Sequence, residues 1–139
     1  MLKGIDPLLG PELLHHLRAM GHGDTLAVVD RNYPAESHGA RTVRLDGVDL
    51  RTALQAVLSV FPVDTFVQPA VQRMLPDDGL QAVHGPADEA IDSAEGRPVA
   101  KGELDRFAFY DEARKAYAIV ATGEQLPYGC YLLTKGVVA

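Results

Sequence analysis

The chain has 139 residues, of which 47% are hydrophobic, and a formal net charge of −6. This length suits a single domain that buries its core without disulfides or a structural metal, so we expect one domain over residues 1–139. The 13 lysines and arginines form no cluster, and the acidic balance argues against a nucleic-acid partner. No apolar run approaches the roughly 18 residues that a membrane span requires, and we expect no membrane partner.

The cysteine count bears on the compartment. Cys130 is the only cysteine, so no internal disulfide can form. The N-terminal stretch "MLKGIDPLLG" lacks the unbroken apolar segment of a secretory peptide. Both observations are typical of a reducing environment, and we expect a cytoplasmic protein.

The first predicted helix and strand can be recognised from the proline and glycine that bound the helix and from their apolar patterns. Pro11 is placed to open a helix, and leucines follow at helical spacing. Gly21 is expected to end this helix in the left-handed conformation. The run "TLAVV" at 25–29 is continuously apolar, which predicts a strand covered on both faces.

The middle of the chain is predicted to contain two further strands with a helix between them. Residues 31–40 are rich in polar residues, with a proline and a glycine, and are expected to form a loop before a short strand near 42–45. Asp49 can cap a second helix that Pro62 stops. A strand is expected at 64–67.

Residues 68–103 are punctuated by prolines and glycines, and leave room for a short helix near Val71 and another near 87–94. The C-terminal part is patterned more clearly: a helix over "RFAFYDEARKA", a buried strand over "YAIVAT" and a last strand over "CYLLTK".

Strands thus alternate with helices along the chain. This order predicts a single α/β domain with a mainly parallel central sheet and helices on both faces. In such folds, ligands bind beyond the carboxyl ends of the strands. Asp30 lies at one such end.

Two candidate functional residues flank the first strand. His22 stands between two glycines, which leave its imidazole open to a ligand. The simpler interpretation is a solvated residue in a turn, and Asp30 could likewise only close a turn through its own backbone. A straight strand separates the two residues by roughly 20 to 25 Å at ~3.3 Å per residue. A shared site therefore needs a loop that folds back or a neighbouring subunit.

The C-terminal stretch offers further candidates. Arg106, at the start of the last predicted helix, can present its planar donors to hydroxyl or carboxylate oxygens, although a plain surface arginine is the simpler reading. Tyr128 lies on a turn, where its hydroxyl could meet a ligand or its ring could merely pack. The nearby Phe107, Phe109 and Tyr110 are expected in the core.

The sequence contains no motif that indicates a metal site, a nucleotide site or a catalytic nucleophile. His15 and His16 are adjacent on a helix and point apart, and His38 and His84 are expected in loops. The chain has no HExxH or CxxC motif, no glycine-rich nucleotide motif and no GxSxG nucleophile. We therefore expect no metal and no cofactor.

Three segments, "MGHGDTLAVVD", "RFAFYDEARKAYAIVATGE" and "YGCYLLTKG", together resemble the fucose mutarotase family. The similarity includes "GPELL", "RLDG" and "FPVDTFVQP", and it covers nearly the whole chain except residues 76–102. It extends more distantly to D-ribose pyranase, which implies a ribose pyranase-like fold.

The resemblance implies roles for particular residues. His22 would be the catalytic acid/base, and sugar contacts would come from Asp30, Arg106 and Tyr128. Tyr128 is also a candidate proton relay. Cys130 occupies the substrate-binding position where the family has asparagine, so an amide is replaced by a weak thiol donor. This difference leaves the preferred sugar open.

The implied activity is the interconversion of the α and β anomers of a free monosaccharide, foremost L-fucose, through acid/base-assisted ring opening. Two alternatives remain: a pyranase that interconverts ring forms of ribose, and a sugar-binding partner of a transporter or kinase without turnover. The family also implies a ring-like homo-oligomer, often a decamer, with sites near subunit boundaries.

Overall fold

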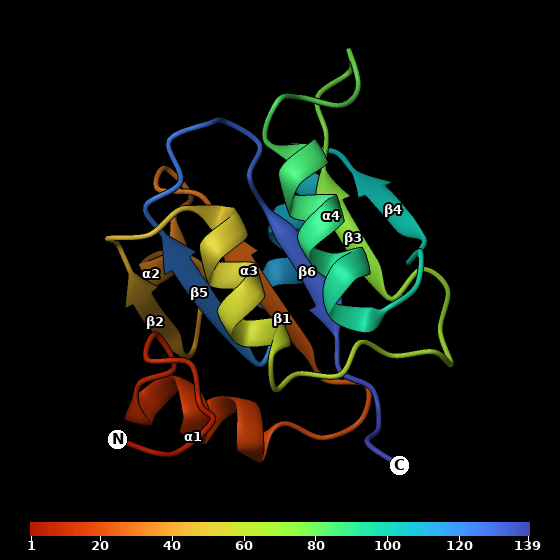
Figure 1. The fold of residues 1–139 in the computed structure, drawn as a ribbon. Coiled ribbons are helices and arrows are strands. Elements are labelled where there is room, and N and C mark those ends of the chain that lie inside the picture. The colour runs from red at the N-terminus through yellow and green to blue at the C-terminus, as the bar shows by residue number, and fades with distance from the viewer.

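The computed structural model describes residues 1–139, and its centre is one six-stranded sheet (Figure 1). The strands are β1 (Thr25–Val29), β2 (Thr42–Leu45), β3 (Val71–Met74), β4 (Lys101–Leu104), β5 (Ala118–Thr122) and β6 (Tyr131–Thr134). They lie in the order β2-β5-β1-β6-β3-β4. The pairs β1–β5, β2–β5 and β3–β4 are parallel, and β6 runs antiparallel to β1 and β3. The predicted mainly parallel sheet is confirmed.

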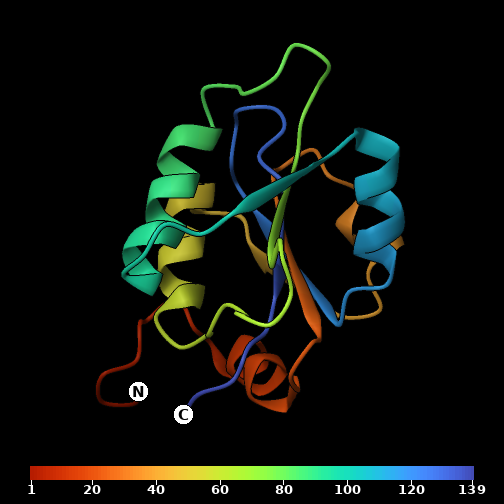
Figure 2. The ribbon, with the colours of Figure 1, turned by 90° about the vertical axis from the view of Figure 1, so that its right-hand side faces the viewer.

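Helices cover both faces of the sheet, as expected. The helices are α1 (Pro11–Ala19), α2 (Ala35–His38), α3 (Leu50–Leu58), α4 (His84–Glu95) and α5 (Arg106–Arg114). Figure 2 shows α3 and α4 on one face and α2 and α5 on the other, with α1 beyond one end of the sheet near both termini.

The continuous apolar run of β1 is explained by this layering. Successive side chains of a strand point to opposite faces. Leu26 and Val28 enter the core that α1, α3 and α4 cover, whereas Ala27 and Val29 enter the core beneath α5. All four side chains are fully buried. β1 is thus a central strand, and its carboxyl end is held rigidly.

Several boundaries agree with the sequence patterns. Asp49 caps α3 through a hydrogen bond that its Oδ1 accepts from the Thr52 N–H at 2.8 Å. α3 ends at Leu58, somewhat before Pro62. The predicted helix near 87–94 lies within α4, and the last helix and the last two strands agree with α5, β5 and β6 to within about two residues.

Other expectations were wrong. Residues 64–67 form no strand; only Val63 makes a single bridge, to Lys135. The short helix expected near Val71 is instead β3, and β4 was not foreseen. β3 is a strand because β4 and β6 pair with it on both edges, and such partners are invisible in a short local pattern.

Two local corrections concern the segments that flank β1. The loop expected over residues 31–40 contains the short helix α2. The left-handed glycine after α1 is Gly23, with a φ of 91°, and not Gly21. Met20 leaves the helix in an extended conformation and is buried, so the reversal of the chain falls two residues later than the sequence suggested.

Candidate functional site

A small hollow lies at the carboxyl end of β1. Asp30 directly follows this strand, Arg106 is the first residue of α5, and Tyr128 and Cys130 come from the segment that leads into β6. The hollow has a volume of about 220 Å³. The structure thus brings together all four residues that were expected to contact a sugar. The other lining residues are Asn32, Tyr33, Met74, Tyr110 and Pro127.

Asp30 connects two backbone segments beside this hollow through hydrogen bonds. Its Oδ1 accepts a hydrogen bond from the Asn32 N–H at 3.0 Å, which is the turn-closing role considered above. Its Oδ2 accepts one from the Gly129 N–H at 3.2 Å. Oδ1 has a second lone pair that no group of the chain uses, so Asp30 can still accept a hydrogen bond from a ligand.

The Cys130 thiol lies beneath the hollow. It is 1% exposed, and its Sγ is 3.6 Å from Asp30 Oδ2. Burial, reinforced by the negative charge of Asp30, raises the pKa of Cys130 well above that of an ordinary thiol. The thiol is therefore neutral, and its single proton is already directed at Asp30.

Tyr128 adopts an unusual backbone conformation, with a φ of 63°. A non-glycine residue in this region is held there by its surroundings, at a cost of about 1 kcal/mol or more. The carbonyl oxygen of Tyr128 lies 3.0 Å from His84 Nε2, and the half-buried side chain lines the hollow. His84 was expected in a loop, but it is the first residue of α4 and is fully buried.

Arg106 is exposed at the N-terminus of α5. Its Nε donates to the Tyr110 hydroxyl at 2.9 Å, and its guanidinium lies over the Tyr110 ring at 5.3 Å from the centroid. The Nη groups have no partner within the chain and can bind a ligand. Of the three aromatic residues expected in the core here, only Phe109 is fully buried, whereas Phe107 is 69% exposed.

Tyr33 is a lining residue that the sequence did not single out. Its hydroxyl lies 2.9 Å from Nδ1 of His38, which ends α2 and does not lie in a loop as expected. His38 Nε2 lies 3.1 Å from Arg114 Nη2. Because a guanidinium only donates, Nε2 accepts, and a neutral His38 donates from Nδ1 to Tyr33. The hydroxyl hydrogen of Tyr33 is therefore free for a ligand.

His22 lies at the opposite end of β1, outside this hollow. Its Nε2 is 2.9 Å from Oδ1 of Asp64, and its imidazole forms a T-shaped pair with the Phe66 ring, with the ring centroids 4.9 Å apart. The His22 side chain is 39% exposed, whereas that of Asp64 is 1% exposed. His22 thus lies in an exposed turn, as the simpler interpretation expected, but its Nε2 also has a buried carboxylate as its partner. Within one chain it does not meet Asp30.

Sequence reasoning missed Asp64 because it placed this residue in a strand. The only signal was its position in "FPVDTFVQP", one of the segments that carry the family resemblance. Spacing alone could not pair it with His22, since 42 residues separate the two.

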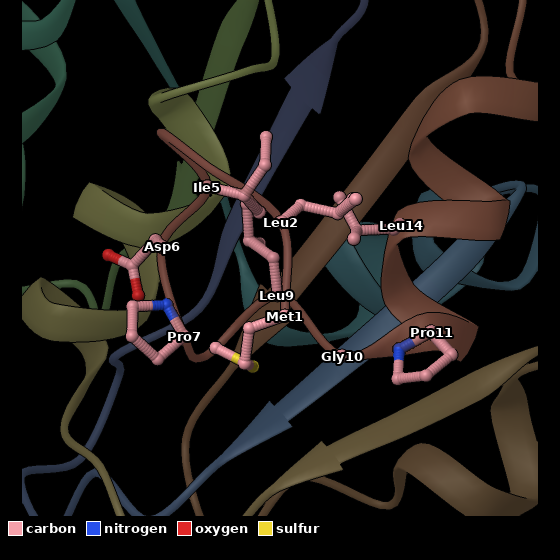
Figure 3. Close-up of a pocket in the computed structure, with 9 residues that line it drawn as sticks. All are labelled: Met1, Leu2, Ile5, Asp6, Pro7, Leu9, Gly10, Pro11 and Leu14. Atoms are coloured by element: carbon pink, nitrogen blue, oxygen red, sulfur yellow. The ribbon is translucent and has the colours of Figure 1, made fainter.

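A larger cavity, of about 460 Å³, lies elsewhere (Figure 3). Its lining comes from the N-terminal segment and the start of α1 and is mostly apolar, and it contains none of the predicted site residues. Such a lining offers few partners for a polar ligand. The structure gathers no group of three or more histidine, cysteine, aspartate or glutamate side chains that could hold a metal.

A hollow lined by both polar and apolar side chains, at the carboxyl end of a central strand in an α/β domain, is the usual location of a small-metabolite site. The chain belongs to the RbsD/FucU transport protein family, whose model matches residues 3–138. No helix is long and apolar enough to cross a membrane.

Individual relatives agree with this membership. Human fucose mutarotase is 43% identical over 99% of this chain and 95% of its own length. A fucose mutarotase from Streptococcus pneumoniae, solved in complex with L-fucose, is 36% identical with a TM-score of 0.92, covering 99% of this chain and 100% of that one. Bacillus subtilis RbsD, solved with D-ribose, shares the fold with a TM-score of 0.76 and 19% identity over the full length of both chains.

Proposed function

We propose that this protein is a fucose mutarotase, an isomerase that interconverts the α and β anomers of free L-fucose. One observation carries the proposal. Asp30, Arg106, Tyr128 and Cys130 surround a single hollow, in a chain that is 43% identical to a protein named fucose mutarotase. The lower identity to the ribose-bound relative, 19%, favours fucose over ribose.

The proposed chemistry is ring opening followed by reclosure. A base takes the proton of the C1 hydroxyl, the bond between C1 and the ring oxygen breaks, and the ring oxygen accepts a proton. Reclosure on the other face of the carbonyl gives the other anomer. His22 is the proposed acid/base and Tyr128 the proposed relay, while Asp30 and Arg106 hold sugar hydroxyls. Each such proton transfer contributes about 10²- to 10⁴-fold.

We propose that a neighbouring subunit completes the site. His22 and the hollow lie at opposite ends of β1, so one chain does not unite them. The side chains beside His22, Phe66 and Val67, are 71% and 46% exposed, which is unusual for large apolar residues without a partner. A ring-like homo-oligomer, such as a decamer, would cover them and bring His22 to the hollow of the next subunit.

Tyr33 joins the proposed sugar contacts. At the position where the resemblance implies an asparagine, the Cys130 thiol is already directed at Asp30 and has no second donor. The free hydroxyl hydrogen of Tyr33 lies on the wall of the same hollow and can replace the missing donor. A reducing, cytoplasmic compartment, where free fucose and the reduced thiol coexist, completes the proposal.

Saturation-transfer NMR of anomer exchange tests this function. The protein should speed exchange between the anomers of L-fucose more than that of galactose or rhamnose, and it should leave the ring forms of ribose unaffected. His22→Ala should lower the exchange rate by about 10²- to 10⁴-fold while the protein still binds sugar. A protein that binds fucose without speeding its exchange would instead be a binding partner without turnover.

A further inference from the structure

Asp64 is a buried carboxylate whose position is tightly fixed. Its backbone N–H donates to the carbonyl oxygen of Thr134, the last residue of β6, at 2.9 Å. Gly136 packs so closely that a Cβ there would lie 2.8 Å from Asp64 Cα. The backbone of Asp64 is therefore bound to the end of the central sheet, and this fixes the position of its carboxylate.

Both oxygens of Asp64 accept hydrogen bonds. Oδ2 accepts from the Val67 N–H at 3.1 Å, and Oδ1 faces His22 Nε2 at 2.9 Å. Burial acts to raise the pKa of Asp64, but the hydrogen bond from His22 and those from the backbone N–H groups of Phe66 and Val67 outweigh it and lower the pKa. Asp64 is thus an ionised carboxylate near neutral pH, and it can only accept.

Because Asp64 can only accept a hydrogen bond, it determines which nitrogen of His22 carries the proton. A neutral imidazole carries one proton, and a carboxylate partner draws it to the nitrogen that faces the carboxylate. That nitrogen is Nε2. Nδ1 is then unprotonated, and it has no hydrogen-bond partner within the chain. The Phe66 ring packs beside the imidazole, inclined at 81° to it.

We propose that Asp64 is the positioning residue of the reaction: it holds the proton of His22 on Nε2, so that Nδ1 is the atom that takes the proton of the C1 hydroxyl. This inference rests on the proposed mutarotase function and assigns an atom to its chemistry.

The proton balance follows from this assignment. The O–H bond at C1 breaks and a bond from Nδ1 to hydrogen forms. The electron pair between C1 and the ring oxygen moves to the ring oxygen, which takes the hydroxyl proton of Tyr128. The resulting imidazolium is paired with the Asp64 carboxylate. Reclosure of the ring returns both protons, so the protein ends unchanged.

Two measurements on the full-length protein test the inference. The first is ¹⁵N NMR of histidine-labelled protein at neutral pH, with the His22 signals assigned by their loss in His22→Ala. We expect the Nε2–H tautomer of His22 in the wild type. The second is the kinetics of fucose anomer exchange for Asp64→Asn. An amide at this position can donate to Nε2 and place the proton on Nδ1.

Asp64→Asn should lower kcat by about 10- to 100-fold, as expected for the loss of a hydrogen bond between charged groups, with little change in KM. Asp64→Glu should recover part of kcat because it retains the carboxylate. Asp49→Asn is the matched control, since Asp49 also accepts a backbone N–H and asparagine caps a helix equally well.

The outcomes separate this inference from the proposed function. A wild type that does not speed exchange contradicts the function itself. An active wild type whose His22 carries its proton on Nδ1 overturns only the role of Asp64. A folded Asp64→Asn with wild-type kcat does the same, and the tautomer measurement decides the matter if Asp64→Asn fails to fold.

Discussion

His84 Nε2 lies 3.0 Å from the carbonyl oxygen of Tyr128 and 3.2 Å from that of Met74. The Gln81 N–H donates to His84 Nδ1 at 2.9 Å, so the proton of the neutral ring is on Nε2 and is shared by the two carbonyl oxygens. A histidine buried in α4 thereby joins the end of β3 to the turn that carries Tyr128. This bond helps to keep Tyr128 at its positive φ.

Protonation of His84 should destabilise the fold. Burial, reinforced by Arg73, lowers the pKa of His84 below the reference value of 6.5 despite the two carbonyl partners. Since the folded-state pKa is the lower one, the stability from a neutral His84 is fully present above pH ~6.5 and is lost as the pH falls through the folded-state pKa. Urea unfolding between pH 8 and pH 5 measures this loss.

The variant His84→Gln keeps a donor near the two carbonyl oxygens but cannot titrate. Its free energy of unfolding should be lower at neutral pH and should change less between pH 8 and pH 5 than that of the wild type. If the variant shows the wild-type slope, the pH dependence originates elsewhere.

Mixed oligomers should reveal a site shared between subunits. His22→Ala and Arg106→Ala each remove one half of the proposed site, and each variant alone should be nearly inactive. After the two are unfolded together and refolded, random assembly should restore about a quarter of the sites, because an intact hollow then meets an intact His22. Anomer exchange before and after mixing is the measurement. Unchanged inactivity in a mixed oligomer would show that the site lies within one chain.

The Tyr33 hydroxyl should contribute to sugar affinity. Tyr33→Phe removes only this hydroxyl and retains the ring that packs against Tyr110. We expect KM for L-fucose to rise by about 3- to 10-fold, the value of one neutral hydrogen bond, with a smaller effect on kcat. Tyr117→Phe is the control, because Tyr117 stacks with Arg41 and does not line the hollow. Equal KM values for both variants would remove Tyr33 from the site.

Cys130 should be inert in the folded protein. The thiol is buried and its pKa is raised by burial and by Asp30, so little thiolate is present to react. An aromatic disulfide reagent at pH 8 should modify it slowly in buffer and rapidly in denaturant. Fast modification in buffer would show that the segment before β6 opens readily.

The amino-acid sequence by itself determined the elements with strong local signals. The apolar run of β1 predicted a strand buried on both faces, and Asp49 predicted the start of α3, because periodicity and capping act over a few residues. The sequence also indicated Asp30, Arg106 and Tyr128 as candidates from their chemistry and their positions beside predicted elements, whereas Cys130 was indicated only through a short segment that resembles a family.

Only the tertiary structure decided which of these residues meet. β3 and β4 lack a clear local pattern and exist because neighbouring strands pair with them. The partners of His22 and Tyr128, which are Asp64 and His84, come from segments more than 40 residues away. The physical reason is that hydrogen bonding and burial depend on distance in space, whereas a linear pattern records only distance along the chain.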